Sequence, residues 1–334
     1  MESTPRFRAA HRSALDHVLA LIAESSWGRG LVLRGSMTMA AWVGEQAREP
    51  ADLDWIVPEP TDIGFTDAAD PFPFVEDLSW VQHWPEAVFG AAGGEMWEDE
   101  QQFETFGLRP VLPPDGLQWV DLTDYLENHT WTSLQDCLIE TIRQRPVTPA
   151  GVVLSADGIE DGSELDYALD YGGTPGLRLR VPWYTVGPEA MSGRIQLDFA
   201  ADEAVFDSPV WTLIPRGDGR APTPCVTAGP ELSLAWKLLW FYTDAHDAEI
   251  YGDGFEGGAG KDLYDAVMLA ESPRTRLTRS LLRKVFGDKA ADFESEDILG
   301  WKVHWDAFQH TNPHVTGDKR EWLERLTRAL SRIA

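Results

Sequence analysis

The sequence contains few cysteines and no long apolar run, and each absence excludes a class of protein. Cys137 and Cys225 lie far apart, with neither CxxC nor Cys–His spacing, so we expect inert thiols in a reducing cytoplasm rather than disulfides or a zinc site. No stretch approaches the roughly 18 uninterrupted apolar residues of a membrane span. Residues 1–6 lack the apolar core of a signal peptide. We therefore expect a cytoplasmic protein without a membrane partner.

Basic residues are also scarce, because 28 Lys and Arg stand against 55 Asp and Glu, a net charge of −27. This balance argues against simple nucleic-acid binding, since phosphate backbones favour Lys and Arg. Residues 272–334 differ, with 12 basic and 9 acidic residues and a net charge of +3. A basic binding surface would most easily be formed by residues of this C-terminal part. We interpret the acidity elsewhere as a general property of a soluble cytoplasmic protein.

The chain has 334 residues, of which 43% are hydrophobic, and this is enough for one large domain or two ordinary ones. The patterns predict an α+β fold. Residues 1–228 form its sheet-containing core, interrupted at about 59–150 by an acidic, Trp-rich insertion. Residues 229–334 form a helical C-terminal domain.

Hydrophobic periodicity and turn residues place the individual elements. The expected strands are residues 31–33, 53–57, 165–169, 177–184, 194–200 and 210–214. The expected helices are residues 11–24, 37–46, 134–143, 232–242, 261–270, 279–285 and 319–333. Ser36 is expected to cap the helix that follows it, and Pro230 occupies a favoured first helical position. The 15 tryptophans are interpreted as core residues, with Trp55 and Trp183 as conceivable platforms for base stacking.

Gly35 and Ser36 end the first expected strand, and Asp52 and Asp54 lie in the second. Glycine lets the backbone approach a phosphate, to which the serine hydroxyl and free helix N–H groups can donate. Side chains alternate along a strand, so Asp52 and Asp54 share a face while Leu53 points into the core. Each motif alone also fits an ordinary helix cap or a surface strand. Together, within one strand–helix–strand unit, they predict a site for Mg²⁺ and a nucleoside triphosphate.

Four charged residues further along the chain are candidates for the same site. Asp198 interrupts an apolar strand, which is unfavourable without a hydrogen bond or a metal, unless the strand end is exposed. Lys237 lies within an apolar helix, so it either extends to solvent or has an anionic partner. Asp262 and Asp265 share one face of a helix, where acidic residues also favour the first turn. Asp52, Asp54 and Asp198 could together hold two Mg²⁺ ions.

The chain resembles the AbiEii/AbiGii-type toxins of the nucleotidyltransferase superfamily, a group that includes the MenT toxins. The matching segments are Leu33-Arg34-Gly35-Ser36, Asp52-Leu53-Asp54, Ile195-Gln196-Leu197-Asp198, the helix around Ala235-Trp236-Lys237-Leu238, and Lys261-Asp262-Leu263-Tyr264-Asp265. The last two are more particular to this family than the first two. The insertion has no counterpart that we can place.

The resemblance implies a nucleotidyltransferase-type mixed sheet with flanking helices and a role for each site residue. Gly35 and Ser36 would hold the triphosphate, and Asp52 and Asp54 would bind Mg²⁺. Asp198 would complete the metal site. Lys237 would contact the phosphates. Asp262 would support the site or help activate the acceptor, and Asp265 is a weaker correspondence.

The leading interpretation is a Mg²⁺-dependent enzyme that transfers a nucleoside monophosphate from an NTP to tRNA or another RNA. By resemblance it would act as the toxin of a toxin–antitoxin or phage-defence system, with a cognate antitoxin. One alternative is transfer to a small molecule such as an aminoglycoside, whose positive charge would suit an acidic chain. Another is a catalytically inactive binding module. Arg34, Arg178, Arg180, Arg194 and the C-terminal arginines would line an RNA path, whereas a ring of carboxylates would favour the cationic acceptor.

Overall fold

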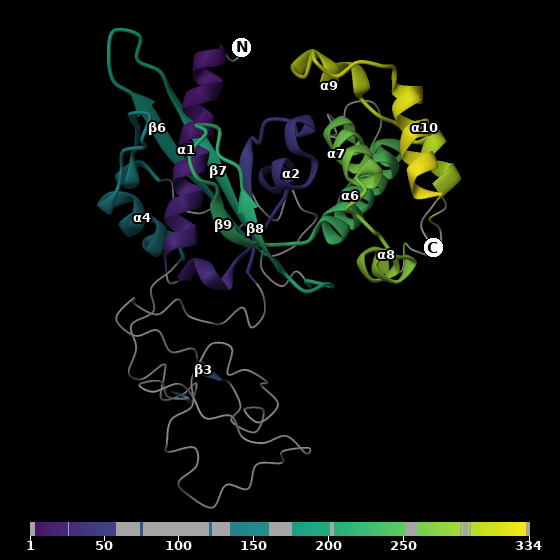
Figure 1. The fold of residues 1–334 in the computed structure, drawn as a ribbon, viewed down its shortest axis with the longest axis horizontal. Helices are drawn as coiled ribbons and strands as arrows, with labels where there is room; N and C mark the ends of the chain where they lie inside the picture. Colours follow the sequence, from purple (N-terminus) through teal and green to yellow (C-terminus); the bar gives the residue numbers. More distant parts are fainter. Residues whose placement is uncertain are drawn as a thin grey trace, which may run out of the picture.

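The protein has a central curled sheet with helices on both faces, as seen in the computed structural model (Figure 1). The structure describes residues 4–25, 27–57, 74–75, 120–121, 134–159, 176–200, 204–251, 259–287, 289, 293 and 295–331. None of the described helices is long and apolar enough to cross a membrane. The chain thus has the mixed sheet, flanking helices and helical C-terminal region that the sequence predicts.

The sheet has seven strands in the order β5-β6-β7-β2-β1-β9-β8. These strands are β1 (Val32–Arg34), β2 (Asp52–Ile56), β5 (Val152–Leu154), β6 (Gly176–Thr185), β7 (Ser192–Ala200), β8 (Val210–Ile214) and β9 (Thr223–Thr227). The pairs β2–β7 and β1–β9 are parallel, and the other neighbours are antiparallel. A separate two-stranded pair joins β3 (Phe74–Val75) to β4 (Val120–Asp121).

The helices are distributed along the whole chain. They are α1 (Pro5–Glu24), α2 (Ser36–Val43), α4 (Leu134–Gln144), α6 (Pro230–Tyr251), α7 (Ala259–Glu271), α8 (Arg279–Phe286), α9 (Trp305–Thr311) and α10 (Lys319–Leu330). Short 3-10 helices occur at Trp27–Gly30, Gly44–Gln46, Ala156–Gly158 and Ser295–Gly300. The last five α-helices lie together at one side of the sheet (Figure 1).

Strand alternation divides the core into two clusters, one on each face of the sheet. On one face, α1 and α4 pack on buried side chains that include Leu33, Leu53 and Leu197. The other cluster contains Val32 and Ile56 together with the apolar side chains of α6, α7, α8, α9 and α10. The C-terminal helices are therefore packed on the sheet through a continuous apolar core.

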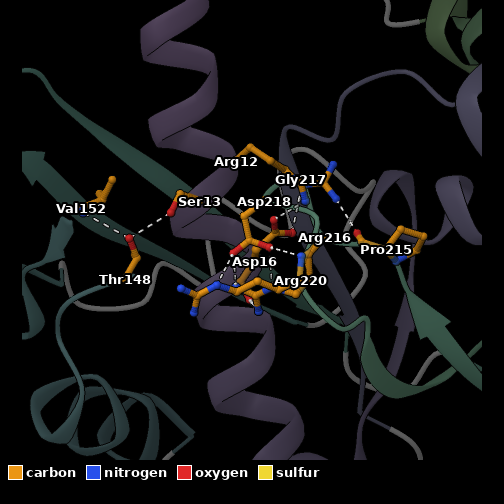
Figure 2. Close-up of polar contacts among 10 residues, drawn as sticks. All are labelled: Arg12, Ser13, Asp16, Thr148, Val152, Pro215, Arg216, Gly217, Asp218 and Arg220. Atoms are coloured by element: carbon orange, nitrogen blue, oxygen red, sulfur yellow. Dashed lines mark hydrogen bonds and ion pairs between the residues drawn. The ribbon is translucent and has the colours of Figure 1, made fainter. Parts of the chain in front are cut away.

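Polar contacts, some of them partly buried, attach α1 to the loop between β8 and β9 (Figure 2). The guanidinium of Arg12 donates to Asp16 Oδ1 (2.9 Å) and to the carbonyl of Pro215 (2.7 Å). The backbone N–H of Gly217 donates to Asp16 Oδ2 (2.8 Å). Burial raises the pKa of Asp16, against the opposing effect of Arg12. This cluster is a structural attachment, with its hydrogen-bonding groups directed at one another.

Most of the expected elements are confirmed, with instructive differences. Serine 36 is not the cap of α2, because Gly35 occupies that position and the Ser36 hydroxyl bonds Asp52 instead. The strands β5 and β9 were not among those expected, and the expected strand at 165–169 lies outside the described residues. The helix α4, which falls within the expected insertion, packs against α1 as part of the core. Trp55 and Trp183 are each 1% exposed, which excludes them as stacking platforms.

Candidate active site

Strand β2 presents two carboxylates on the face of the sheet opposite α1. Leu53 and Trp55 are buried in the core beneath α1, whereas Asp52 and Asp54 point the other way and keep partial exposure. This alternation follows from the two-residue period of a strand, as the sequence predicts. The two candidate metal ligands thus lie side by side on one face.

Charged residues on the neighbouring strands extend this face into a row. Asp54 is the register partner of Asp198 on β7 and of Arg34 on β1. Asp198 is in turn the partner of Arg178 on β6. Four adjacent strands therefore carry an arginine, two aspartates and an arginine in line, so that two cations flank two anions.

The position of Asp54 in this row changes its acidity. Burial is the largest effect, and the nearby carboxylates of Asp52 and Asp198 add to it, raising the pKa of Asp54 to about 7. The cations Arg34 and Lys237 act in the opposite direction without cancelling the rise. Asp54 is thus a carboxyl group that a bound cation would stabilise in its charged form.

The turn between β1 and α2 is built around Asp54 and Asp52. Gly35 has φ +76° and ψ −155°, a conformation that favours glycine, and an added Cβ would clash with Asp54 Oδ2. The Ser36 hydroxyl donates to Asp52 Oδ1 (3.0 Å). The first N–H groups of α2 therefore lie next to both carboxylates, which is the arrangement expected of a phosphate and metal site.

Asp198, expected as a third metal ligand, is engaged by protein donors. Arg178 donates from Nε to Oδ1 (2.8 Å) and from Nη2 to Oδ2 (2.9 Å), and Gln196 Nε2 donates to Oδ2 (3.0 Å). Both side chains of the Arg178–Asp198 pair are buried. The exposed-edge alternative for Asp198 is therefore wrong. Its carboxylate is satisfied by a cation of the chain itself.

Lys237 has anionic partners, which is one of the two alternatives predicted for a lysine within an apolar helix. Its ammonium donates to Asp262 Oδ1 (2.8 Å) and lies 3.3 Å from Asp265 Oδ2. Burial would lower the pKa of Lys237, but the two carboxylates outweigh this effect and raise it. The side chain is 6% exposed, so the alternative of an extended lysine with its charge in solvent is wrong.

Helix α6 also contacts the sheet half of the site through aromatic rings. The Arg34 guanidinium lies 5.2 Å from the ring centre of Trp236 and 5.3 Å from that of Trp240. The Lys237 ammonium lies 4.9 Å from the Trp240 ring centre. Trp240 thus touches one cation from the sheet and one from its own helix, and such contacts favour fixed positions for both. The structure brings together both groups of residues expected from distant parts of the sequence.

One site residue escaped the sequence analysis. Arg48, in the connection between α2 and β2, forms bonds of 3.1 and 3.2 Å to both oxygens of Asp265. The side chain of Asp265 is fully buried, so this pair is shielded from solvent. No local pattern distinguishes Arg48 from other residues of a connecting segment, because Glu49 and Pro50, which follow it, are ordinary loop residues. The presence of Asp265, one turn from Asp262, was the available signal that a further cation was required.

The carboxylates of β2 are suited to hold a divalent cation. Among the described residues, no group of three or more His, Cys, Asp and Glu side chains is placed to hold a metal ion. Asp52 and Asp54, side by side on one face of β2, supply the hard oxygen donors that Mg²⁺ prefers. Asp198 already receives three hydrogen bonds from the protein.

The comparison with protein families identifies the larger part of the chain. A family described as nucleotidyl transferase AbiEii toxin, type IV toxin–antitoxin system, matches residues 134–332, which include Asp198, Lys237 and Asp262. The segment with Gly35, Ser36 and the β2 carboxylates lies outside that match. No curated protein matches the chain. Since the match covers more than half of the 334 residues, the chain belongs to the AbiEii nucleotidyl transferase toxin family.

Proposed function

We propose that the protein transfers a nucleoside monophosphate from an NTP to an RNA acceptor, with tRNA as the leading candidate, at the site between β2, α2, α6 and α7. The carrying observation is the convergence of Asp52 and Asp54 with the buried Lys237–Asp262 pair. Family membership supports the nucleotidyltransferase activity, the NTP substrate and an antitoxin partner.

In this proposal an acceptor hydroxyl attacks the α-phosphate and pyrophosphate leaves. The absence of a Cβ at Gly35 lets the N-terminus of α2, where the triphosphate would bind, lie close against Asp54, and Ser36 orients Asp52. Lys237, held by Asp262, faces the phosphates with a fixed positive charge. Asp52 and Asp54 would hold Mg²⁺, which when bound neutralises charge that develops on the phosphates. Asp198, through its pair with Arg178, keeps the adjoining strand in register beside Asp54.

The arginines on the same face favour RNA over a cationic acceptor. Arg180 on β6 is the register partner of Gln196, and Arg194 lies further along β7, whereas the charge of Arg178 is neutralised by its buried pair with Asp198. Arginine is a preferred partner of phosphate groups, whereas an aminoglycoside would be repelled here. The total charge of −27 is the observation that keeps the small-molecule acceptor as a second candidate.

The test is incubation of the protein with each labelled NTP, Mg²⁺ and either total RNA or an aminoglycoside. We expect label to enter RNA, most of it in the tRNA fraction, and D52A to abolish the transfer. The control is E140A, which removes an exposed carboxylate on α4 and leaves the transfer unchanged. Label in the aminoglycoside alone would support the second candidate, and no transfer with any NTP would support an inactive binding module.

A further inference from the structure

Four side chains with alternating charges join the two halves of the candidate site. Arg48 binds both oxygens of Asp265, Asp265 lies 3.3 Å from Lys237, and Lys237 binds Asp262 at 2.8 Å. All three residues from α6 and α7 are buried, and the Arg48 side chain is 11% exposed. The network therefore acts as one electrostatic unit rather than as a set of screened surface pairs.

The position of Arg48 in the chain connects this network to the strand that carries Asp52 and Asp54. Arg48 lies four residues before Asp52, in the connection that leads from α2 into β2. The same connection is attached to α7 a second time, because the Tyr264 hydroxyl donates to the carbonyl of Gln46 (2.6 Å). The carboxylates of Asp265, Asp262 and Asp52 all raise the pKa of Arg48, although burial alone would lower it. Arg48 therefore lies in the field of both groups of carboxylates.

The charges explain why a cation is needed at this position. Asp262 and Asp265 carry two negative charges next to the single positive charge of Lys237. Without Arg48 this group would have a net charge of −1 and would repel a triphosphate. With Arg48 the group is neutral, and the charge of Asp265, which lies 3.3 Å from the lysine ammonium, is shared with the guanidinium that binds both of its oxygens. A buried arginine with a bidentate carboxylate is also geometrically fixed.

We propose that Arg48 is a positioning residue for nucleotide binding, which neutralises Asp265 so that Lys237 remains available to the NTP phosphates. The inference rests on the proposed function, since it specifies how that site keeps its phosphate-binding charge. Arg48 itself contacts neither substrate nor reacting atoms in this scheme. It acts through Asp265 and Lys237.

The chain offers a matched control in the Arg12–Asp16 pair of α1. This pair also joins a partly buried arginine to a buried aspartate, at 2.9 Å, but it lies in the attachment of α1 to the β8–β9 loop (Figure 2). Arg12 also lies 3.6 Å from Glu49, the residue after Arg48. R12M therefore removes a similar charge near the same connection while leaving Asp265 paired.

The experiment measures equilibrium binding of fluorescent ribose-labelled NTPs with Mg²⁺, together with KM, kcat and thermal unfolding. We expect R48M to raise the nucleotide Kd and KM by about tenfold or more, with a smaller change in kcat. R48K, which keeps the charge but loses the bidentate geometry, should change Kd by less than R48M does. R12M should lower the unfolding temperature and leave Kd unchanged.

The double variant R48M/D265N separates the electrostatic role from a merely structural one. With Asp265 neutral, loss of Arg48 should change Kd little relative to D265N alone, a comparison that also serves if R48M does not fold. Unchanged Kd in R48M, or equal loss of affinity from R48M in both backgrounds, would overturn the inference. If the wild-type chain bound none of the four nucleotides, the proposed function would fail and this inference with it.

Discussion

The two faces of the central sheet use the same strands for opposite purposes. On the α1 face, Leu33, Leu53 and Leu197 are fully buried among apolar side chains. On the other face, the residues next to them in the sequence are Arg34, Asp54 and Asp198. Apolar packing on one face supplies the stability that allows like charges to lie side by side on the other. A substitution at one of these six positions should therefore affect mainly stability or mainly transfer, according to the face on which it lies.

The sharpest test of this division is D54N, from which we expect the largest effect. The amide keeps the shape of the side chain but cannot hold a cation as a carboxylate does, so transfer should fall by about 10²–10³-fold or more. Stability should be unchanged or slightly increased, because repulsion from Asp52 and Asp198 disappears. Transfer of labelled NMP and urea unfolding measure the two effects. A large loss of stability with normal transfer would contradict the assignment of Asp54.

L53A, at the adjacent position, should show the opposite behaviour. Leu53 is completely buried between β2 and α1, and replacing such a leucine by alanine costs about 2–5 kcal/mol of unfolding free energy. Urea unfolding would measure this loss. At a temperature where the variant is folded, its kcat/KM should stay within about tenfold of the wild type, because the carboxylates keep their positions. An inactive but fully stable L53A would break the comparison between the faces.

Alanine substitutions at Gly35 and Gly44 distinguish the effect of backbone strain from the effect of displacing a site residue. Both glycines have positive φ, but an added Cβ meets Asp54 at Gly35 and open space at Gly44. We expect G44A to cost about 1–2 kcal/mol and to keep its activity. G35A should lose at least as much stability and also most of its transfer activity, because Asp54 must move. Equal activity in the two variants would show that Asp54 tolerates displacement.

The smallest effect should be the contribution of His17, on the α1 face, to the pH dependence of stability. Burial lowers the pKa of His17 below its ordinary value of 6.5, while its Nε2 contacts the carbonyl of Arg145 at 2.8 Å. The unfolded chain then binds the proton more readily, so this contribution to stability is complete above pH 6.5 and is lost as the pH falls below it. H17Q should reduce the fall in unfolding temperature between pH 8 and pH 5. An unchanged pH profile in H17Q would exclude His17 as its cause.

Sequence patterns predicted the elements better than the contacts between distant elements. The β2 alternation and the helix that begins at Pro230 are local properties, and both were correctly predicted. The helix around Lys237 required an anionic partner or an exposed ammonium, and only the packing of α7 beside α6 decided between them. Arg178 as the partner of Asp198 follows from strand register, which the sequence leaves open. The predicted roles of the site residues stay predictions until the variants are measured.

By itself the sequence determined which side chains share a face of each strand and helix, because those periods are set by local backbone geometry. It also carried the segments by which the family is identified. Only the tertiary structure decided that Arg48 neutralises Asp265 and that Arg178 engages Asp198. Such pairs join residues 217 and 20 positions apart, and their formation depends on how whole elements pack. Local periodicity contains no information about that packing, whereas burial makes each unpaired charge so unfavourable that the folded chain must supply a partner.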